Sequence, residues 1–412
     1  MGIMSKCRSC GEPLHHTCVD LGMSPLCESY INGDALNKME PFFPLKVNVC
    51  DKCYLVQLDE YVSPEEIFAE YAYFSSYSED WLKHAQKYVN DMVVRLGLDH
   101  RSFVVEIASN DGYLLQYFCE KKIPVLGIEP AKNVAKVAEE KGVHTLVKFF
   151  GVQTAAALAK EEKLTDLLIG NNVLAQVPDL NDFVGGMKIL LKPKGVITME
   201  FPHLTKLIKE NQFDTIYHEH FSYFSLYTSN IIFNKHGLKV FDVDEIPTHG
   251  GSLRIFACHS DDNSKEISQN VKRLLLEEET LGVNTLAYYQ SFQEQVQETK
   301  RKLLDFLIDA KRMGKAVVGY GAPGKGNTLL NYCGIRTDFL DYTVDRNPYK
   351  QGMFLPGTHI PIYPPEKINE TKPDYVLILP WNFKDEIIKQ MKHIDEWGGK
   401  FVVPIPEVKV LS

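Results

Sequence analysis

Apolar runs that alternate with helical periodicity organise the middle of the chain. The stretch "SFVVEIASNDGYLLQYF" predicts a buried strand over 103–107, a polar turn of small residues over 108–112 and a helix from Tyr113. Upstream, "SEDWLKHAQKYVNDMVVRLGL" begins at Ser78 with a helix-capping residue type and acidic neighbours, and its apolar residues recur at helical spacing, which predicts a helix. Downstream, "VLGIEP" predicts a second strand that closes at Glu129. This order of elements is typical of an α/β domain.

The turn and the acid that follow these two strands indicate a ligand. A glycine-bearing turn after the first strand lets a ligand approach the backbone, and an acid at the end of the second strand can accept both hydroxyls of a ribose. Gly112 and Glu129 stand at these two places, so a nucleoside-type ligand is expected. The turn lacks the G-x-G-x-x-G pattern of dinucleotide enzymes. Another doubly wound nucleotide fold, in which these side chains only cap helices, is the alternative.

Glu106 lies inside the first predicted strand, and a short turn ending in glycine follows it. This arrangement resembles the first motif of class I methyltransferases, which bind S-adenosylmethionine. "TDLLIGNNVLAQVPDL" extends the resemblance, because it places two asparagines at the exit of a fourth strand over 167–170, where that fold lines its cofactor. "GGMKILLKPKGVITMEFP" then resembles the helix, turn and fifth strand of the fold. The resemblance implies that the cofactor is bound by Glu106, Ala108, Asn110, Gly112, Glu129, Asn171 and Asn172.

A second strand–turn–helix unit follows a long amphipathic connection. "KAVVGYGAPGKGNTLLNYCG" predicts a strand, a glycine-rich turn over 319–326 and a helix. Glycines such as Gly321 let backbone amides approach phosphate oxygens, and Lys325 adds positive charge, although the register is not that of a Walker loop. "FLDYTVDRNPYKQGMFLPGTHIPI" and "PDYVLILPWNF" predict further strands, so we expect a second parallel α/β domain. A domain used only for packing is the alternative.

Length and charge narrow the class of protein. The 412 residues suggest two or three domains, and 44% hydrophobic with 24% charged residues is a globular composition. The formal net charge of −9 argues against a nucleic-acid partner. No apolar run approaches the roughly 20 residues that cross a bilayer, and "MGIMSKCRSC" lacks the apolar core of a signal peptide. We therefore expect a cytoplasmic protein without a membrane partner, as a monomer or weak dimer.

In a reducing compartment, paired cysteines are first interpreted as metal ligands. "CRSC" and "CDKC" supply Cys7, Cys10, Cys50 and Cys53, and two such knuckles can offer four thiolates to one structural zinc ion. Four free thiols or a redox pair are the alternative. A ligand could also be replaced by one of Cys18, Cys27, His15 and His16.

The segment "YHEHFSYFS" groups two histidines around a glutamate, with four aromatic rings. A single histidine is usually a satisfied polar residue in or near a core. Two bases, an acid and phenols in one short segment favour a polar pocket instead. Residue types alone leave open whether that pocket holds a metal, a proton or a substrate.

Taken together, the four-cysteine module, the SNDG turn, "YHEHFSYFS", "HGGSLR", "GYGAPGKGNTLLNY" and "VDRNPYKQGMFLPGTHIPI" resemble the zinc-containing sugar C-methyltransferases. That family methylates a carbon, most often carbon 3, of a nucleotide-linked 4-keto-6-deoxyhexose and uses S-adenosylmethionine and a structural zinc. The resemblance implies a zinc module over 1–75, a class I methyltransferase domain over 76–260 and a carboxy-terminal Rossmann-like domain over 261–412 that binds the sugar nucleotide. One departure is Ala108, where the family often has glycine.

The resemblance also implies residues for the chemistry. Carbon attacks a sulfonium methyl group well only after a proton beside the carbonyl has been removed, so one base and one partner for the enolate oxygen are needed. In the family the sugar site is lined by the residues that correspond to Tyr217, Glu219 and His220, and His220 is the expected base. A phenol from "EYAYFSSYS" is a further candidate, with Tyr73 ranked ahead of Tyr71 and Tyr77. Substrate contacts are expected from Gly321, Lys325 and Arg254.

Two rival classes of function remain at this point. In one, His218 and His220 bind a catalytic metal, with Glu219 nearby. In the other, the same domains form a non-catalytic sugar-nucleotide sensor. The sequence leaves open whether the substrate nucleotide is thymidine- or guanosine-based, and which keto-sugar epimer and face react.

Overall fold

The computed structural model describes residues 5–68 and 74–411. The chain divides into two compact units, each assembled from three separate segments. Unit 1 contains Met1–His15, Cys50–Leu204 and Glu219–Thr285. Unit 2 contains His16–Val49, Thr205–His218 and Leu286–Ser412.

Unit 1 is built on a seven-stranded sheet in the order β10-β11-β8-β7-β4-β5-β6. Five of its strands are parallel, whereas β11 is antiparallel to β8 and β10 is antiparallel to β11. Counted along the chain from the β6 edge, the order is 3-2-1-4-5-7-6. The strands are β4 (Val104–Ile107), β5 (Val125–Ile128), β6 (Thr145–Leu146), β7 (Thr165–Asn171), β8 (Leu191–Pro202), β10 (Leu238–Ile246) and β11 (Ser252–His259).

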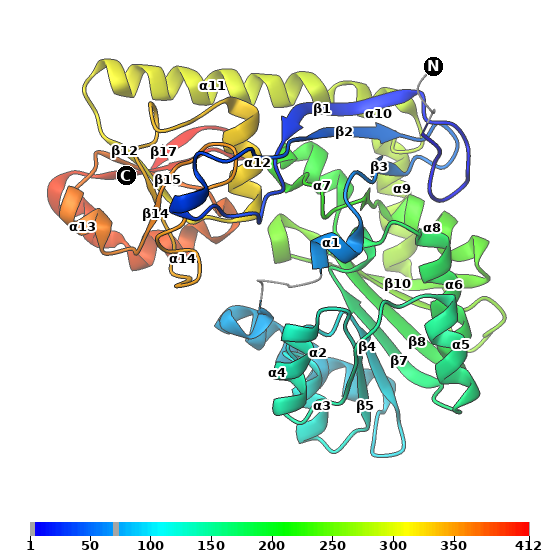
Figure 1. Cartoon of the computed structure of the whole chain (residues 1–412). Coiled ribbons are helices and arrows are strands. Elements are labelled where there is room, and N and C mark those ends of the chain that lie inside the picture. Colours follow the sequence, from blue (N-terminus) through cyan, green and yellow to red (C-terminus); the bar gives the residue numbers. More distant parts are fainter. Residues whose placement is uncertain (1–4, 69–73, 412) are drawn as a thin grey trace. The chain divides into compact units, whose positions relative to one another are not determined.

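Helices cover both faces of this sheet, as Figure 1 shows for α2 to α4 on one side and α5 and α6 on the other. Successive strand residues point to opposite faces, so an apolar strand in such a sheet feeds two cores. Val104 packs in the core that contains residues of α2 and α3, and Val105 packs in the core that contains residues of α5 and α6. The helices are α1 (Pro64–Phe68), α2 (Glu79–Leu96), α3 (Leu115–Glu120), α4 (Lys132–Glu140), α5 (Val152–Lys160), α6 (Leu180–Leu190), α8 (Leu226–Lys235) and α9 (Gln269–Leu281). Unit 1 also pairs β3 (Val56–Leu58) with β9 (Ser222–Tyr223) in antiparallel register.

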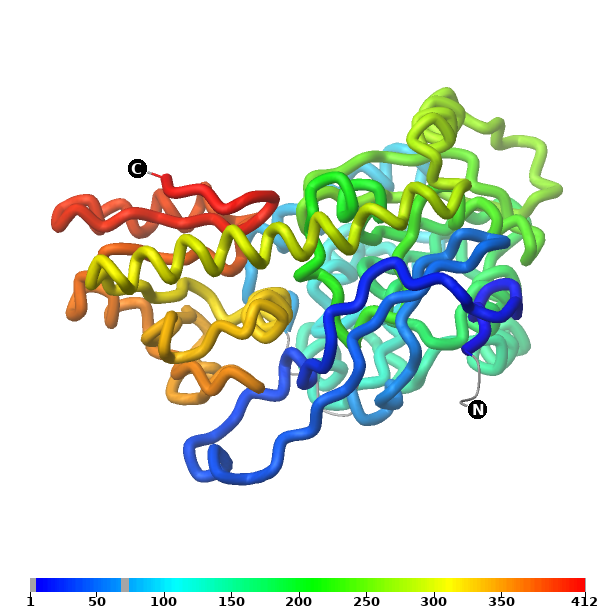
Figure 2. Tube along the Cα trace, turned by 90° about the horizontal axis from the view of Figure 1, so that it is seen from above, coloured from blue at the N-terminus to red at the C-terminus, as the bar shows by residue number. Residues whose placement is uncertain are grey.

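Unit 2 contains a six-stranded sheet in the order β14-β13-β12-β15-β16-β17, in which all strands except β17 are parallel. Its strands are β12 (Val317–Tyr320), β13 (Thr343–Val344), β14 (Ile362–Tyr363), β15 (Tyr375–Ile378), β16 (Lys400–Val403) and β17 (Lys409–Leu411). Its helices include α10 (Leu286–Gln290), α11 (Phe292–Arg312), α12 (Gly324–Cys333), α13 (Lys367–Thr371) and α14 (Lys384–Gln390). The chain enters the middle segment of unit 2 within α7 (Leu204–Lys209). The first segment is an antiparallel pair, β1 (His16–Ser24) and β2 (Phe43–Val49), whose strands lie side by side in blue in Figure 2.

The expected elements are present, with small shifts at their ends. The strand predicted over 103–107 is β4, and the helix predicted near Ser78 is α2, which Ser78 caps by accepting a hydrogen bond from the Trp81 amide at 3.3 Å. The helix expected from Tyr113 begins at Leu115, because the turn before it extends further than its glycine. Two α/β sheets with parallel cores confirm the predicted fold class. No helix among the described residues is long and apolar enough to cross a membrane.

Candidate functional site

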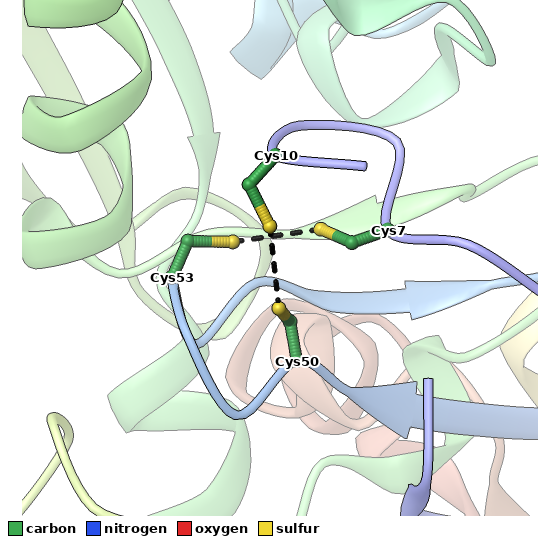
Figure 3. Close-up of side chains that lie close together, drawn as sticks. All are labelled: Cys7, Cys10, Cys50 and Cys53. Carbon is green, nitrogen blue, oxygen red and sulfur yellow. Dashed lines mark hydrogen bonds between the residues drawn. The ribbon is translucent and has the colours of Figure 1, made fainter. Parts of the chain in front are cut away.

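Four cysteine sulfurs converge in unit 1 (Figure 3). The sulfurs of Cys7 and Cys53 are 3.5 Å apart, as are those of Cys10 and Cys50, and all four lie within 4.8 Å of one another. A tetrahedral zinc ion with Zn–S bonds of about 2.3 Å holds its sulfurs about 3.8 Å apart. The cluster therefore has the dimensions of a closed four-thiolate zinc site.

The backbone of each knuckle turns in the same way. Gly11 donates its amide to the carbonyl of Cys7 at 2.9 Å, and Tyr54 donates to Cys50 at 3.1 Å. Both donors follow the second cysteine of their knuckle, and both have a left-handed backbone, with φ of 85° at Gly11 and 57° at Tyr54. Gln57 also donates to the sulfur of Cys7 at 3.2 Å. The two amide bonds close the knuckle turns, and the bond from Gln57 stabilises a thiolate at Cys7 and orients it.

Among the described residues, these cysteines form the only group of three or more potential metal ligands. The alternative ligands Cys18, Cys27, His15 and His16 are not part of it. No comparable group surrounds His218 or His220 within the described chain, so the geometry does not favour the catalytic-metal interpretation.

The turn after β4 has an unusual backbone. Ala108, Asn110 and Gly112 all have positive φ, at 55°, 49° and 75°. At Gly112 a Cβ would lie 3.1 Å from Cγ2 of Val143, so glycine suits both the conformation and the space. Ala108 adopts a conformation that costs a residue with a Cβ about 1 kcal/mol, at the position where the related family often has glycine.

Glu129 directly follows β5 and braces this turn. Its Oε2 accepts the Asn110 amide at 3.0 Å, and its Oε1 accepts the Ala131 amide at 2.9 Å. Burial raises the pKa of Glu129, and these two backbone hydrogen bonds oppose the rise. Each oxygen keeps one further acceptor position, which suits the two hydroxyls of a ribose.

A second carboxylate, Glu200, organises the carboxyl end of β8, where it pairs with Asn171 of β7. It is fully buried, and it lies 3.1 Å from Nε2 of His84 and accepts from Nη2 of Arg254 at 2.7 Å and from the hydroxyl of Thr248 at 3.0 Å. Burial opposes ionisation, yet the hydrogen bond with His84 and the charge of Arg254 hold the pKa of Glu200 at about 2. Glu200 is therefore ionised near neutral pH, and it lies at the carboxyl end of β8, in the sheet that also contains β4.

Arg254, expected to bind substrate, is 6% exposed and is directed at Glu200. Its guanidinium also lies 4.6 Å from the centre of the Tyr88 ring. In this arrangement Arg254 links α2, β8 and β11.

Aromatic side chains from α2 face the same edge of the sheet. Trp81 stacks on His84 with ring centres 5.0 Å apart and on Tyr113 at 6.0 Å, and the ring of His249 meets it edge-on at 5.5 Å. Nε2 of His249 lies 2.9 Å from the amide nitrogen of Asn172. This group of aromatic rings therefore extends from α2 to Asn172, one of the two asparagines predicted to line the cofactor.

The histidines of "YHEHFSYFS" fall on either side of a unit boundary, which lies between His218 and Glu219. His218 is directed at backbone, with Nε2 3.2 Å from the carbonyl oxygen of Pro44 and its ring edge-on to Phe43 at 5.9 Å. Burial lowers the pKa of His218. These contacts account for His218 without a metal.

Glu219 and His220 belong to unit 1, and both are at least nine-tenths buried. The ring of His220 meets that of Tyr223 edge-on at 6.3 Å. Tyr217 lies in the unit 2 segment. Tyr71 and Tyr73 lie outside the described residues, and Tyr77 is 64% exposed.

In unit 2, the glycine-rich turn leads from β12 into α12. Gly321 has φ of 88°, and a Cβ there would lie 2.5 Å from Cδ of Pro380. Nζ of Lys325 donates to Oδ1 of Asn382 at 2.9 Å and lies 4.6 Å from the centre of the Trp381 ring. Burial lowers the pKa of Lys325, and the charge of Asp214 opposes that shift.

Comparison with known proteins decides the family. The chain is 37% identical over 409 residues to C-methyltransferase NovU of Streptomyces niveus, and the alignment covers 99% of this chain and 97% of that protein. Residues 7–68 match a family of zinc binding domains, 81–243 a methyltransferase domain family and 247–406 the family of C-methyltransferase C-terminal domains.

The chain belongs to the zinc-containing, S-adenosylmethionine-dependent C-methyltransferases.

Solved structures resemble this C-methyltransferase over part of its length. Magnesium protoporphyrin IX methyltransferase from Synechocystis, solved with bound S-adenosylmethionine, is 14% identical and covers 48% of this chain and 89% of its own, with a TM-score of 0.33. The PH0226 protein of Pyrococcus horikoshii is 15% identical and covers 49% of this chain and 99% of its own, with a TM-score of 0.38.

The carboxyl edge of the unit 1 sheet suits the cofactor of a C-methyltransferase. Oδ1 of Asn171 and of Asn172 has no hydrogen-bond partner among the described residues. Burial raises the pKa of Glu106 well above its ordinary value, a hydrogen bond from Tyr113 opposes the rise, and the nearby charges of Glu129 and Asp111 add to it. Buried acceptors of this kind fit the cationic ammonium and sulfonium groups of S-adenosylmethionine.

Sequence reasoning missed the cluster around Glu200. An acid inside the apolar strand "ITMEF" is the same signal that identified Glu106 in "FVVEI", and it was available at both strands. His84 and Trp81 carried no comparable signal, because on a helix with apolar periodicity they resemble ordinary core and boundary residues.

Proposed function

We propose that this C-methyltransferase methylates carbon 3 of a nucleotide-linked 4-keto-6-deoxyhexose through an enolate, in the biosynthesis of branched deoxysugars. The residues that support the proposal are those of the resemblance, above all "YHEHFSYFS" and "VDRNPYKQGMFLPGTHIPI". The 37% identity to a C-methyltransferase over nearly the whole chain supports carbon as the methylated atom.

The observation that carries the proposal is the burial of an acid and a base that are neighbours in the sequence, Glu219 and His220. Glu219 is 9% exposed and His220 is 8% exposed. Buried imidazole and carboxyl groups are costly unless they have polar partners, and a base with an adjacent acid suits removal of a proton from carbon.

In the proposed reaction, His220 takes the proton from carbon 3, next to the 4-keto group. The electron pair of the broken C–H bond becomes an enolate, whose oxygen is stabilised by a phenol, with Tyr73 as the first candidate. Glu219 orients His220 or holds a sugar hydroxyl, and Tyr217 contacts the sugar. S-adenosylmethionine supplies the methyl group, and the enolate carbon forms the new bond as the bond from sulfur to that methyl breaks.

We further propose that the nucleotide is held by the carboxy-terminal domain. The domain limits 1–75, 76–260 and 261–412 are consistent with the family matches over 7–68, 81–243 and 247–406. The turn with Gly321 and Lys325 is the proposed diphosphate contact, because α12 begins there and brings backbone amides and a cation to one place.

The test is product analysis. The protein is incubated with S-adenosylmethionine and a panel of thymidine- and guanosine-linked 4-keto-6-deoxyhexoses of different configuration, and products are examined by mass spectrometry and NMR. We expect one methyl group on carbon 3 of at least one panel member, and none on the matching 4-hydroxy sugar, which cannot form the enolate. Methylation of oxygen or nitrogen, or of no keto-sugar, would contradict the proposal.

A further inference from the structure

The sheet edge of unit 2 repeats the backbone arrangement found at the sheet edge of unit 1. Ala108 is the first residue after β4, has φ of 55° and donates its amide to the Ile128 carbonyl at 2.7 Å. Gly321 is the first residue after β12, has φ of 88° and donates its amide to the Val344 carbonyl at 2.6 Å. In each unit the turn after the first strand is thus tied to the last residue of the second strand.

The acid that follows the second strand is repeated as well. Asp345 directly follows β13, as Glu129 follows β5. Oδ2 of Asp345 accepts the Ala322 amide at 2.7 Å, and Oδ1 accepts the Asn347 amide at 2.8 Å. As for Glu129, one donor comes from the turn after the first strand and the other lies two residues beyond the acid. Two independent sheets therefore fix a carboxylate in one and the same way.

This geometry leaves a defined capacity for a ligand. A carboxylate has about four acceptor positions, and the two backbone amides use one on each oxygen. One position on each oxygen remains, so Asp345 can accept one hydroxyl or a vicinal pair. Its side chain is partly exposed, and the end of the second strand is where doubly wound sheets hold the pentose of a nucleotide.

Two lysines at the same edge suit an anionic ligand. Nζ of Lys350 donates to the Ala322 carbonyl at 2.9 Å and lies 3.6 Å from Oε2 of Glu28. Lys325 lies in the first turn of α12, and the charge of the fully buried Asp214 acts on it. Two cations suit a phosphate next to the pentose.

We propose that Asp345 accepts the pentose hydroxyls of the nucleotide that carries the sugar substrate. The inference rests on the proposed function, because it takes the ligand of unit 2 to be that nucleotide. Asp345 in unit 2 would bind the pentose of the substrate nucleotide in the way that Glu129 in unit 1 is predicted to bind the ribose of the cofactor.

The test is calorimetric binding of nucleoside diphosphates to the whole protein. Thymidine diphosphate is compared with its 3′-deoxy derivative, and uridine and guanosine diphosphates are compared with their 2′-deoxy and 2′,3′-dideoxy derivatives. Loss of the hydroxyls that Asp345 accepts should weaken binding by about 10- to 100-fold, the effect of losing a hydrogen bond to a charged group. Asp345→Asn should weaken this discrimination, because its amide offers one neutral acceptor oxygen in place of two charged ones. The 2′-deoxy pairs show whether the site accepts one hydroxyl or two.

Glu129→Gln is the matched control. It should weaken binding of S-adenosylhomocysteine and leave the hydroxyl discrimination of the nucleotides unchanged. Equal affinity of dideoxy and parent nucleotides for the wild type, undiminished discrimination in Asp345→Asn, or no nucleotide binding would overturn the inference. If Asp345→Asn does not fold, the comparison of parent and deoxy nucleotides with the wild-type protein is sufficient to test the inference. Binding that discriminates hydroxyls without methyl transfer to any keto-sugar would instead defeat the proposed function.

Discussion

Glu106 and Glu200 lie on strands of one sheet, yet their surroundings shift their pKa values in opposite directions. Both are fully buried. His84 and Arg254 contact Glu200, and its pKa is about 2, so it is ionised near neutral pH. Through these contacts the carboxylate ties α2 and β11 to β8. Burial holds Glu106 toward its neutral form, and a cationic ligand would reverse that shift. The same residue type thus serves as a brace at one strand and is the predicted cofactor ligand at another.

His220 is the residue on which the proposed chemistry depends most directly. His220→Asn roughly keeps the size and a hydrogen-bond donor but cannot accept the proton, so turnover should fall by about 10²- to 10⁴-fold while substrate still binds. In heavy water with S-adenosylhomocysteine, which has no methyl group to transfer, the wild type should exchange the hydrogen on carbon 3 for deuterium. Mass spectrometry of the recovered sugar nucleotide measures this exchange, and the variant should show none.

His218→Asn serves as the matched control for His220. Its imidazole is placed against the Pro44 carbonyl, so we expect the exchange to persist. Near-normal turnover by His220→Asn would exclude it as the base. Loss of exchange in the His218 variant alone would revive a catalytic role for the other histidine.

At the scale of elements, the two cysteine knuckles act as one structural part. Each is a short turn whose buried residues pack against the core of unit 1, and a shared ion would hold the two turns together. Gln57 on β3 donates to Cys7, so the site also fixes a strand of unit 1.

Removal of one knuckle ligand should therefore unfold this part of the chain. Cys50→Ser should lose its zinc and become poorly soluble, as measured by elemental analysis and by the soluble fraction after expression. Cys119→Ser, which changes a partly exposed cysteine on α3 outside the cluster, should keep one zinc per chain. A zinc-free Cys50→Ser that remained folded and fully active would refute the structural role.

Elements with strong local patterns were predictable from the sequence. The run "FVVEI", the glycine of the following turn and the capping Ser78 each act within a few residues, and the structure contains β4, the turn and α2 where they were expected. Glu200 itself carried a sequence signal, but its association with His84 and Arg254 was not predictable, because the three residues come from elements that only the folded sheet brings together. The roles of individual site residues remain predictions.

On the scale of the whole molecule, segments far apart in the chain build each unit. The β1–β2 pair belongs to unit 2 although the cysteines on either side of it belong to unit 1. Local periodicity cannot show which unit a segment belongs to, because this depends on contacts between segments that are distant in the sequence. The two sheets nevertheless each hold a carboxylate at the sheet edge through backbone amides, Glu129 in one and Asp345 in the other.

These edges should respond to different ligands. In hydrogen–deuterium exchange measured by mass spectrometry, S-adenosylhomocysteine should slow the amides of 108–112 and 129–131 in unit 1. A nucleoside diphosphate should slow those of 321–326 and 345–347 in unit 2. Protection of 321–326 by S-adenosylhomocysteine alone would mean that the ligands have been assigned to the wrong sheets.

The chain passes from one unit to the other at five places, after His15, Val49, Leu204, His218 and Thr285. A unit made of one continuous segment can be exchanged between genes by recombination at its two ends. Here the exchange of a single continuous segment would carry off only part of a unit, and the exchange of all of unit 2 would need a junction at each of the five crossings. We therefore expect changes of substrate to arise by substitution within the chain more readily than by replacement of a whole unit.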